Sequence, residues 1–137
     1  MNTKVYKMLF AKVKVQTGMF GSKKRLVLDG CCATVKTAQG EISLIVRAAE
    51  NNSDPTSIIQ VFKFDTKKKE RSAEFASIDA WGAVSSGNMQ LVSFTGKKFG
   101  TSSYLITISN ISSGEYGVIV NPNLKVDRVT ISYFGVK

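Results

Sequence analysis

The stretch ISSGEYGVIV, residues 111–120, is a small polar turn that runs directly into an apolar segment. Tyr116 lies two residues after Gly114, near the start of the expected strand. In Greek-key sandwiches a tyrosine at such a place buries its ring, and its hydroxyl bonds upstream backbone to fix a crossing between sheets. Ile111, Gly114 and Tyr116 therefore predict a structural corner made of an apolar plug, a turn and a tie. Because buried tyrosines usually find a hydrogen-bond partner, we expect Tyr116 to hold shape and not to react.

Short extended segments, separated by turn signals, continue in both directions from this stretch. Turns recur about every 8 to 12 residues and no window has a sustained helical period, a pattern typical of sandwiches and barrels. The sequence therefore predicts an all-β fold: a two-sheet antiparallel β-sandwich, Greek-key, Ig-like or jelly-roll-like, with about 9 to 10 strands. We expect one domain over residues 1–137. The clearest expected strands are 4–15, 25–28, 31–37, 42–48, 89–94, 104–108, 115–120 and 125–136.

Two regions leave alternatives open. In DPTSIIQVFKFD, residues 54–65, an aspartate before a proline suits a helix start, whereas the β-branched residues that follow favour a strand. We expect a strand entered by one helical turn. RSAEFASIDAW, residues 71–81, is expected to return as a strand with Trp81 in the core, because a tryptophan carries a large apolar area. The first strand, with its alternating lysines, is expected to pair either within its own domain or with a neighbour.

The two cysteines, Cys31 and Cys32, are adjacent. Neighbouring side chains of a strand point to opposite faces, so the sequence predicts two reduced thiols, one of them in the core. The alternative is a reactive or metal-binding thiol. No CxxC spacing or positioned base accompanies the pair, so the alternative is less favoured.

The chain contains no histidine, which removes the commonest general base and zinc ligand together. Its ten acidic residues form no recognisable ligand loop or glycosidase pair. No phosphate-binding loop, nucleophile elbow or dinucleotide fingerprint occurs. The sequence therefore predicts a protein that is not an enzyme, with no catalytic residue, no metal site and no cofactor.

Positive charge is the strongest functional signal: 19 Lys and Arg against 10 Asp and Glu give a formal net charge of +9. Such a balance attracts anionic partners. The basic residues form three clusters at predicted turns, each near a phenylalanine, and if the turns gather they suit a polyanion such as nucleic acid. The alternative is that these lysines solvate hairpin tips and protect sheet edges. The candidate polyanion-binding residues are Lys23, Lys24, Arg25, Lys67, Lys68, Lys69, Arg71, Lys97 and Lys98, with Phe20, Phe64 and Phe99 as their aromatic neighbours.

No apolar stretch approaches the ~18 residues that a membrane span requires. The apolar run at residues 8–11 is too short for the core of a signal peptide, so the expected location is cytoplasmic or within a virion.

Three segments carry a resemblance: NNSDPTSIIQVFKFDTKKKER at 51–71, ISSGEYGVIV at 111–120 and ISYFGVK at 131–137. Together they resemble a group of uncharacterised β-sandwich proteins common in Bacteroidetes bacteria and their phages. In that group a DP turn leads to a basic hairpin, then to a turn of the LxPGEYA type and a final strand that ends in FGV. Ser113 stands where the group favours proline. The resemblance implies a β-sandwich and assigns no activity.

The function expected from these observations is a non-enzymatic structural or protein-interaction module within a larger assembly, such as a capsid-decorating or tail component of a phage. Its partners would be other proteins or copies of itself. The runner-up is a nucleic-acid-binding module that uses the basic hairpins. The third candidate is a carbohydrate-binding module in which Trp81, Tyr104 or Tyr133 stacks on sugar.

Overall fold

A computed structural model describes residues 5–6, 9–17, 23–123 and 128–137. Fourteen strands and one short helix lie in these segments, and nine of the strands have five residues or more. The elements are β1 (Val5–Tyr6), β2 (Leu9–Thr17), β3 (Lys23–Asp29), β4 (Lys36–Thr37), β5 (Gly40–Arg47), α1 (Pro55–Ile58), β6 (Ile59–Lys63), β7 (Asp65–Thr66), β8 (Glu70–Ile78), β9 (Val84–Ser86), β10 (Gln90–Leu91), β11 (Thr95–Phe99), β12 (Ser103–Ile111), β13 (Gly114–Val120) and β14 (Arg128–Val136).

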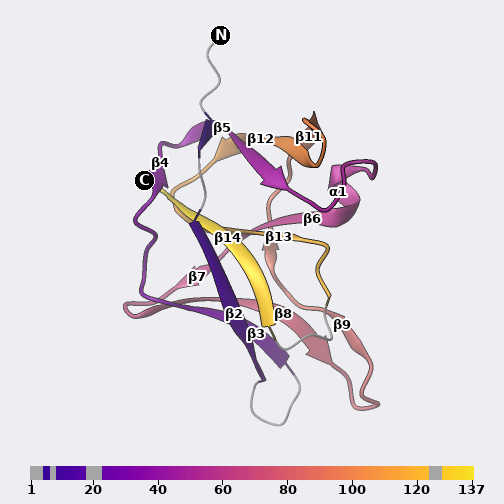
Figure 1. The fold of residues 1–137 in the computed structure, drawn as a ribbon. Helices are drawn as coiled ribbons and strands as arrows, with labels where there is room; N and C mark the ends of the chain where they lie inside the picture. Colours follow the sequence, from indigo (N-terminus) through magenta and orange to yellow (C-terminus); the bar gives the residue numbers. More distant parts are fainter. Residues whose placement is uncertain (1–4, 7–8, 18–22, 124–127) are drawn as a thin grey trace.

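The strands form two sheets (Figure 1). The smaller has the order β1-β5-β12-β11, and the larger follows β10-β6-β13-β14-β2-β3-β8-β7, with β4 beside β14 and β9 beside β8. All described pairs are antiparallel except β1 with β5 and β4 with β14. The predicted all-β, antiparallel, two-sheet fold is confirmed. The first long strand, β2, pairs with β14 and β3 of its own chain, which answers the question left open by the sequence.

Two hydrophobic cores share the middle of the larger sheet. One lies between the smaller sheet and strands β6, β13 and β14, and includes Tyr104, Val118 and Phe134. The other lies inside the curl of the larger sheet and includes Phe62, Phe75 and Ile119. Strands β6 and β13 therefore bury both faces, and β13 is buried without a break from Glu115 to Ile119. Strand β14 has core on both faces only toward its end, and it alternates between exposed and buried residues from Arg128 to Ile131.

The larger sheet curls because residues 59–66, which form β6 and β7, pair with strands from opposite ends of that sheet. Strand β6 pairs with β13, and β7, which begins two residues later, pairs with β8 from the far side of the sheet. Where β6 and β8 separate, the 84–91 segment lies between them: the Gly87 amide donates to the Phe75 carbonyl at 3.1 Å, and β10 pairs with β6. The curled sheet encloses the second core and leaves one convex, solvent-facing side.

Helix α1 and β6 confirm the expectation of one helical turn that leads into a strand. The Asp54 carboxylate accepts the Thr56 amide at 2.9 Å, and the Thr56 hydroxyl and amide bonds lower the pKa of Asp54. Pro55 occupies the first turn, where its missing N–H costs nothing. With only four residues, α1 is far short of a bilayer, and no helix in the described segments is long and apolar enough to cross one.

The predictions for residues 31–37 were wrong in two ways. Only Lys36–Thr37 is a strand, and the chain then passes to the other sheet. Cys31 and Cys32 are joined by a disulfide, with their Cα atoms 3.7 Å apart. The argument for reduced thiols assumed a strand, in which neighbouring side chains diverge. Cys31 lies in a bend and Cys32 in irregular backbone, so that assumption fails.

The core placement of Trp81 was also wrong, since the side chain is 93% exposed. Strand β8 ends at Ile78, three residues earlier than the expected strand. Trp81 therefore lies in the turn between β8 and β9.

Candidate functional site

The predicted corner lies between β12 and β13. The Tyr116 hydroxyl donates to the Ser112 carbonyl at 2.8 Å, and its buried ring stacks on Phe134 with centroids 5.6 Å apart. Ile111 is buried in the same core, and Gly114 has a φ of 155°, a value that L side chains rarely adopt. These contacts tie the turn to the core. The Tyr116 hydroxyl is thus bonded to backbone, and the Lys63 ammonium lies over the ring, 5.9 Å from its centroid.

The three basic clusters lie in different parts of the molecule (Figure 1). Residues 67–69 lie at the β7–β8 hairpin on the left of the view, and residues 97–98 lie on β11 at the upper right. Lys23 pairs with Ser77, whereas Asp29 pairs with Glu70, so residues 23–25 and the hairpin occupy opposite ends of the β3–β8 ladder. The structure therefore does not bring the three clusters together as one surface.

Arg71, one of the candidate polyanion-binding residues, is only 4% exposed. Its guanidinium donates to the Gly30 carbonyl at 3.0 Å, to the Asp29 carbonyl at 2.9 Å and to the Glu115 carboxylate at 3.5 Å. It also lies over the Tyr133 ring, 5.1 Å from its centroid. Contrary to the prediction, Arg71 is not available to an external anion. It holds the loop that carries the disulfide.

A different basic surface is present on the convex side of the curled sheet. Its cations come from three neighbouring strands, β14, β2 and β3, whose opposite sides face the second core. All five side chains are exposed. Neighbouring strands lie about 4.8 Å apart and same-face residues about 6.7 Å apart along a strand, so the cations occupy a patch roughly 10 Å wide and 20 Å long. We call this surface the basic face; it consists of Lys12, Lys14, Lys23, Arg25 and Arg128.

Few negative charges balance the basic face. Lys14 is directly opposite Arg128, an arrangement of like charges that is unfavourable between paired strands. Glu74 is the one carboxylate in register with the five cations among the described residues: it is opposite Arg25 and 3.2 Å from the Lys23 ammonium. The Asn88 amide, with a smaller contribution from Lys23, lowers the pKa of Glu74, so it is ionised at neutral pH.

The sequence pointed to only two of these five residues, Lys23 and Arg25, within the first cluster. Lys12 and Lys14 are among the alternating lysines of the expected first strand, and Arg128 was not singled out. The alternation of lysines in β2 was a signal, but only the pairing of β2 with β14 and β3 shows that the charges meet.

The proposed aromatic neighbours differ in their exposure. Phe64 is buried at 3% exposure, Phe99 is 46% exposed on β11 beside Lys98, and Phe20 lies outside the described residues. Of the three candidate sugar-stacking residues, Tyr104 is fully buried and donates to the Ser53 carbonyl at 2.8 Å. Tyr133 is partly buried beneath Arg71. Trp81 alone of these three presents its ring to solvent.

Trp81 is held at the tip of the β8–β9 hairpin by its turn. The Asp79 carboxylate accepts the amides of Trp81 and Ala83, each at 2.9 Å, and Gly82 has a left-handed φ of 82°. The Asp79 amide also donates to the Ala83 carbonyl at 3.1 Å. The backbone beneath the indole is thus fixed at both sides. Figure 1 shows this hairpin at the lower right, at the same end of the curled sheet as the start of β3.

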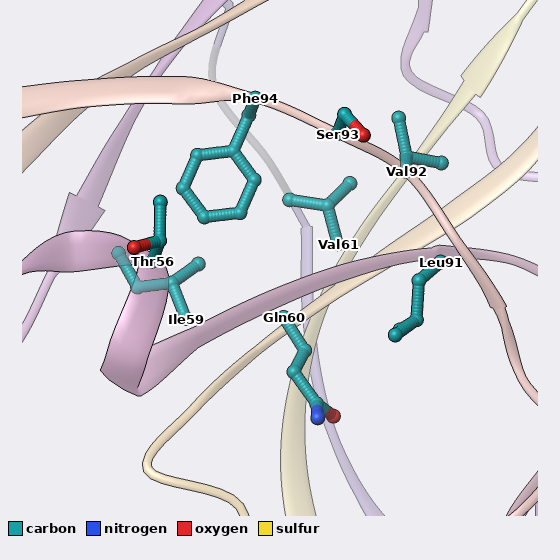
Figure 2. Close-up of a pocket in the computed structure, with 8 residues that line it drawn as sticks. All are labelled: Thr56, Ile59, Gln60, Val61, Leu91, Val92, Ser93 and Phe94. Carbon is teal, nitrogen blue, oxygen red and sulfur yellow. The ribbon is translucent and has the colours of Figure 1, made fainter.

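A hollow of about 350 Å³ lies where the chain crosses from β10 to β11 (Figure 2). Figure 2 shows Phe94 reaching from the crossing segment toward Thr56 and Ile59. The lining side chains are apolar or neutral, so this hollow offers no acid or base for proton transfer. They are Thr56, Ile59, Gln60, Val61, Leu91, Val92, Ser93 and Phe94.

A second hollow, of about 530 Å³, adjoins the disulfide and the β7–β8 hairpin. Lys36, Lys67, Lys68 and Lys137 contribute to its lining. Its one acidic lining residue, Glu115, already accepts the Ala33 amide at 2.5 Å and pairs with Arg71. The clusters at 23–25 and 97–98 do not line this hollow.

In the described parts of the chain, no group of three or more His, Cys, Asp or Glu residues is arranged to hold a metal ion. No protein-family model, curated protein or solved structure matches the chain.

Proposed function

We propose that this protein is a non-enzymatic interaction module that docks on an anionic partner through the basic face. The observation that carries the proposal is the Lys14–Arg128 pair, two exposed cations in direct register on neighbouring strands. Like charges at this spacing repel, and an anion placed over both replaces the repulsion with attraction.

Edge protection does not account for all of these charges. Lysines guard sheet edges because an unpaired strand recruits other chains. Arg25 has a paired residue on each side, Gln16 of β2 and Glu74 of β8. Lys14 and Arg128 face one another across the β2–β14 ladder, where the backbones of the two strands are already paired. Solubility requires only polar side chains here, and Thr130 and Gln16 on the same convex side already meet that need.

The non-enzymatic part of the proposal is supported by the absence of histidine from the sequence and by the neutral lining of the hollow beside β6. An assembly of acidic subunits, favoured by the sequence analysis, is one kind of anionic partner. Docking of this kind gains association rate and specificity from complementary charge.

Retention on immobilised heparin, a generic polyanion, tests this proposal. The variant Lys14→Glu/Arg128→Glu is expected to elute at a clearly lower salt concentration than the wild type. The matched control Lys97→Glu/Lys98→Glu makes the same change in net charge on β11, in the other sheet, and is expected to remain close to the wild type. Equal losses in both variants would show that net charge alone is responsible, and absence of wild-type retention at low salt would likewise overturn the proposal.

A further inference from the structure

We infer that the partner of the basic face is a single-stranded nucleic acid, one of whose bases stacks on Trp81. This inference rests on the proposed function and names its ligand. Proteins that bind single strands combine a cationic track for the backbone with exposed aromatic rings for the bases. Both elements are present at one end of the curled sheet.

The track leads toward the tryptophan. Along the sheet the cations follow one another in the order Lys12, Lys14, Arg25 and Lys23, in steps of two residues or about 7 Å. Lys23 is opposite Ser77, which lies four residues before Trp81. The turn that carries Trp81 therefore lies at the same end of the β3–β8 ladder as Lys23.

The exposure of the Trp81 ring and the fixed backbone of its turn suit stacking on a base. The ring is 93% exposed. The Asp79 carboxylate fixes the backbone beneath it, so little backbone conformational entropy is lost on binding. Any base presents a flat face to an indole, which makes the contact tolerant of sequence. A duplex hides those faces within its stack, and neither an acidic protein nor a sulfated polysaccharide carries a base. A single strand thus uses both elements of the surface.

The chain has one tryptophan, so its intrinsic fluorescence reports on Trp81 alone. The experiment titrates a 20-nucleotide oligothymidine, measuring tryptophan quenching and, with a labelled oligonucleotide, anisotropy. The comparison ligands are a 20-base-pair duplex, heparin and poly-glutamate. We expect quenching with the single strand, and an affinity for that strand about 5- to 150-fold lower in Trp81→Ala, the range measured for loss of one stacked base. Heparin binding by Trp81→Ala is expected to match the wild type.

The salt dependence of single-strand binding tests whether the cations of the basic face contact phosphates. A single strand gives a slope of about −0.7 for each neutralised phosphate, so five engaged cations give roughly −3.5. Lys14→Gln/Arg128→Gln is expected to reduce the slope to about −2, whereas Lys97→Gln/Lys98→Gln leaves it unchanged. Circular dichroism of each variant establishes that it is folded.

The outcomes separate the two proposals. Binding of heparin, duplex or poly-glutamate as strongly as the single strand, with no loss in Trp81→Ala, overturns the nucleic-acid inference and leaves the anionic docking function standing. If no polyanion binds at low salt, both fall. If single-strand binding depends on Trp81 but does not change in Lys14→Gln/Arg128→Gln, the proposed role of the basic face in binding phosphates is wrong.

Discussion

Replacement of Arg71 by methionine is expected to destabilise the protein more than any surface change of charge. The guanidinium is buried, and it bonds the carbonyls of Asp29 and Gly30 and the carboxylate of Glu115. Arg71→Met leaves the Glu115 charge buried, with the Ala33 amide as its remaining donor among these contacts. Breaking a buried pair in this way costs about 3 to 5 kcal/mol. For a domain of this size the melting temperature falls by roughly 10 to 20 °C.

Urea unfolding followed by far-ultraviolet circular dichroism measures this loss. Tryptophan fluorescence is a poor reporter of unfolding here, because the Trp81 ring is already in solvent in the folded protein. Arg47→Met is the matched control: Arg47 is exposed on β5, and its replacement is expected to change stability by less than about 0.5 kcal/mol.

A double-mutant cycle isolates the orphaned charge. Arg71→Met/Glu115→Leu removes both charges and is expected to be about 1 to 3 kcal/mol more stable than Arg71→Met. Recovery is incomplete because the carbonyls of Asp29 and Gly30 and the amide of Ala33 lose their partners. The proposed role of the buried pair would be refuted if Arg71→Met lowered the free energy of unfolding by less than about 1 kcal/mol, or if the double variant were less stable than Arg71→Met.

Three further changes test other parts of the structure. Tyr116→Phe removes one buried hydroxyl bond and is expected to cost about 0.5 to 1.5 kcal/mol in urea unfolding, and an unchanged midpoint contradicts its role as a tie. Lys14→Glu converts a like-charge pair with Arg128 into an opposite-charge pair and is expected to gain about 0.2 to 1 kcal/mol while weakening retention on heparin; a loss of stability contradicts the register. Glu74 has a folded pKa below its ordinary 4.5, so its stabilising effect is present above that pH and is lost as the pH falls through the folded value. Glu74→Gln is therefore expected to lower the urea midpoint at pH 7, and this deficit is expected to shrink as the pH falls below 4.5; a deficit that stays the same as the pH falls contradicts this assignment.

The features that sequence predicted well depend on local chemistry. Asp54 and Pro55 predicted one helical turn, and the β-branched residues after them predicted β6, because capping and branching act within a few residues. The turn before Tyr116 is local in the same sense, since its hydroxyl reaches a carbonyl only four residues upstream.

Two features were not predicted from the sequence, for different reasons: one depends on residues far along the chain, and the other had a local signal that was given too little weight. The loop at Cys31 and Cys32 is shaped by Arg71 and Glu115, whose contacts with it span 41 to 82 residues. Trp81 was different, because its turn signal was visible: Asp79 and Gly82 have the spacing of a capped turn, but the apolar area of the indole was given more weight.

The basic face contains a pair of like charges, Lys14 and Arg128, that is unfavourable in the isolated chain and that folding does not require. Strands β2 and β14 already bury Val15 and Ile131 on their inner side, so their hydrophobic pattern fixes the register whatever side chains face outward. That register places Lys14 opposite Arg128, where threonine or glutamine would avoid the repulsion. Stability is commonly traded against function at surfaces that bind a partner. The proposed single strand would relieve this repulsion with its phosphates and would offer a base to the exposed Trp81, which lies at the Lys23 end of the same sheet.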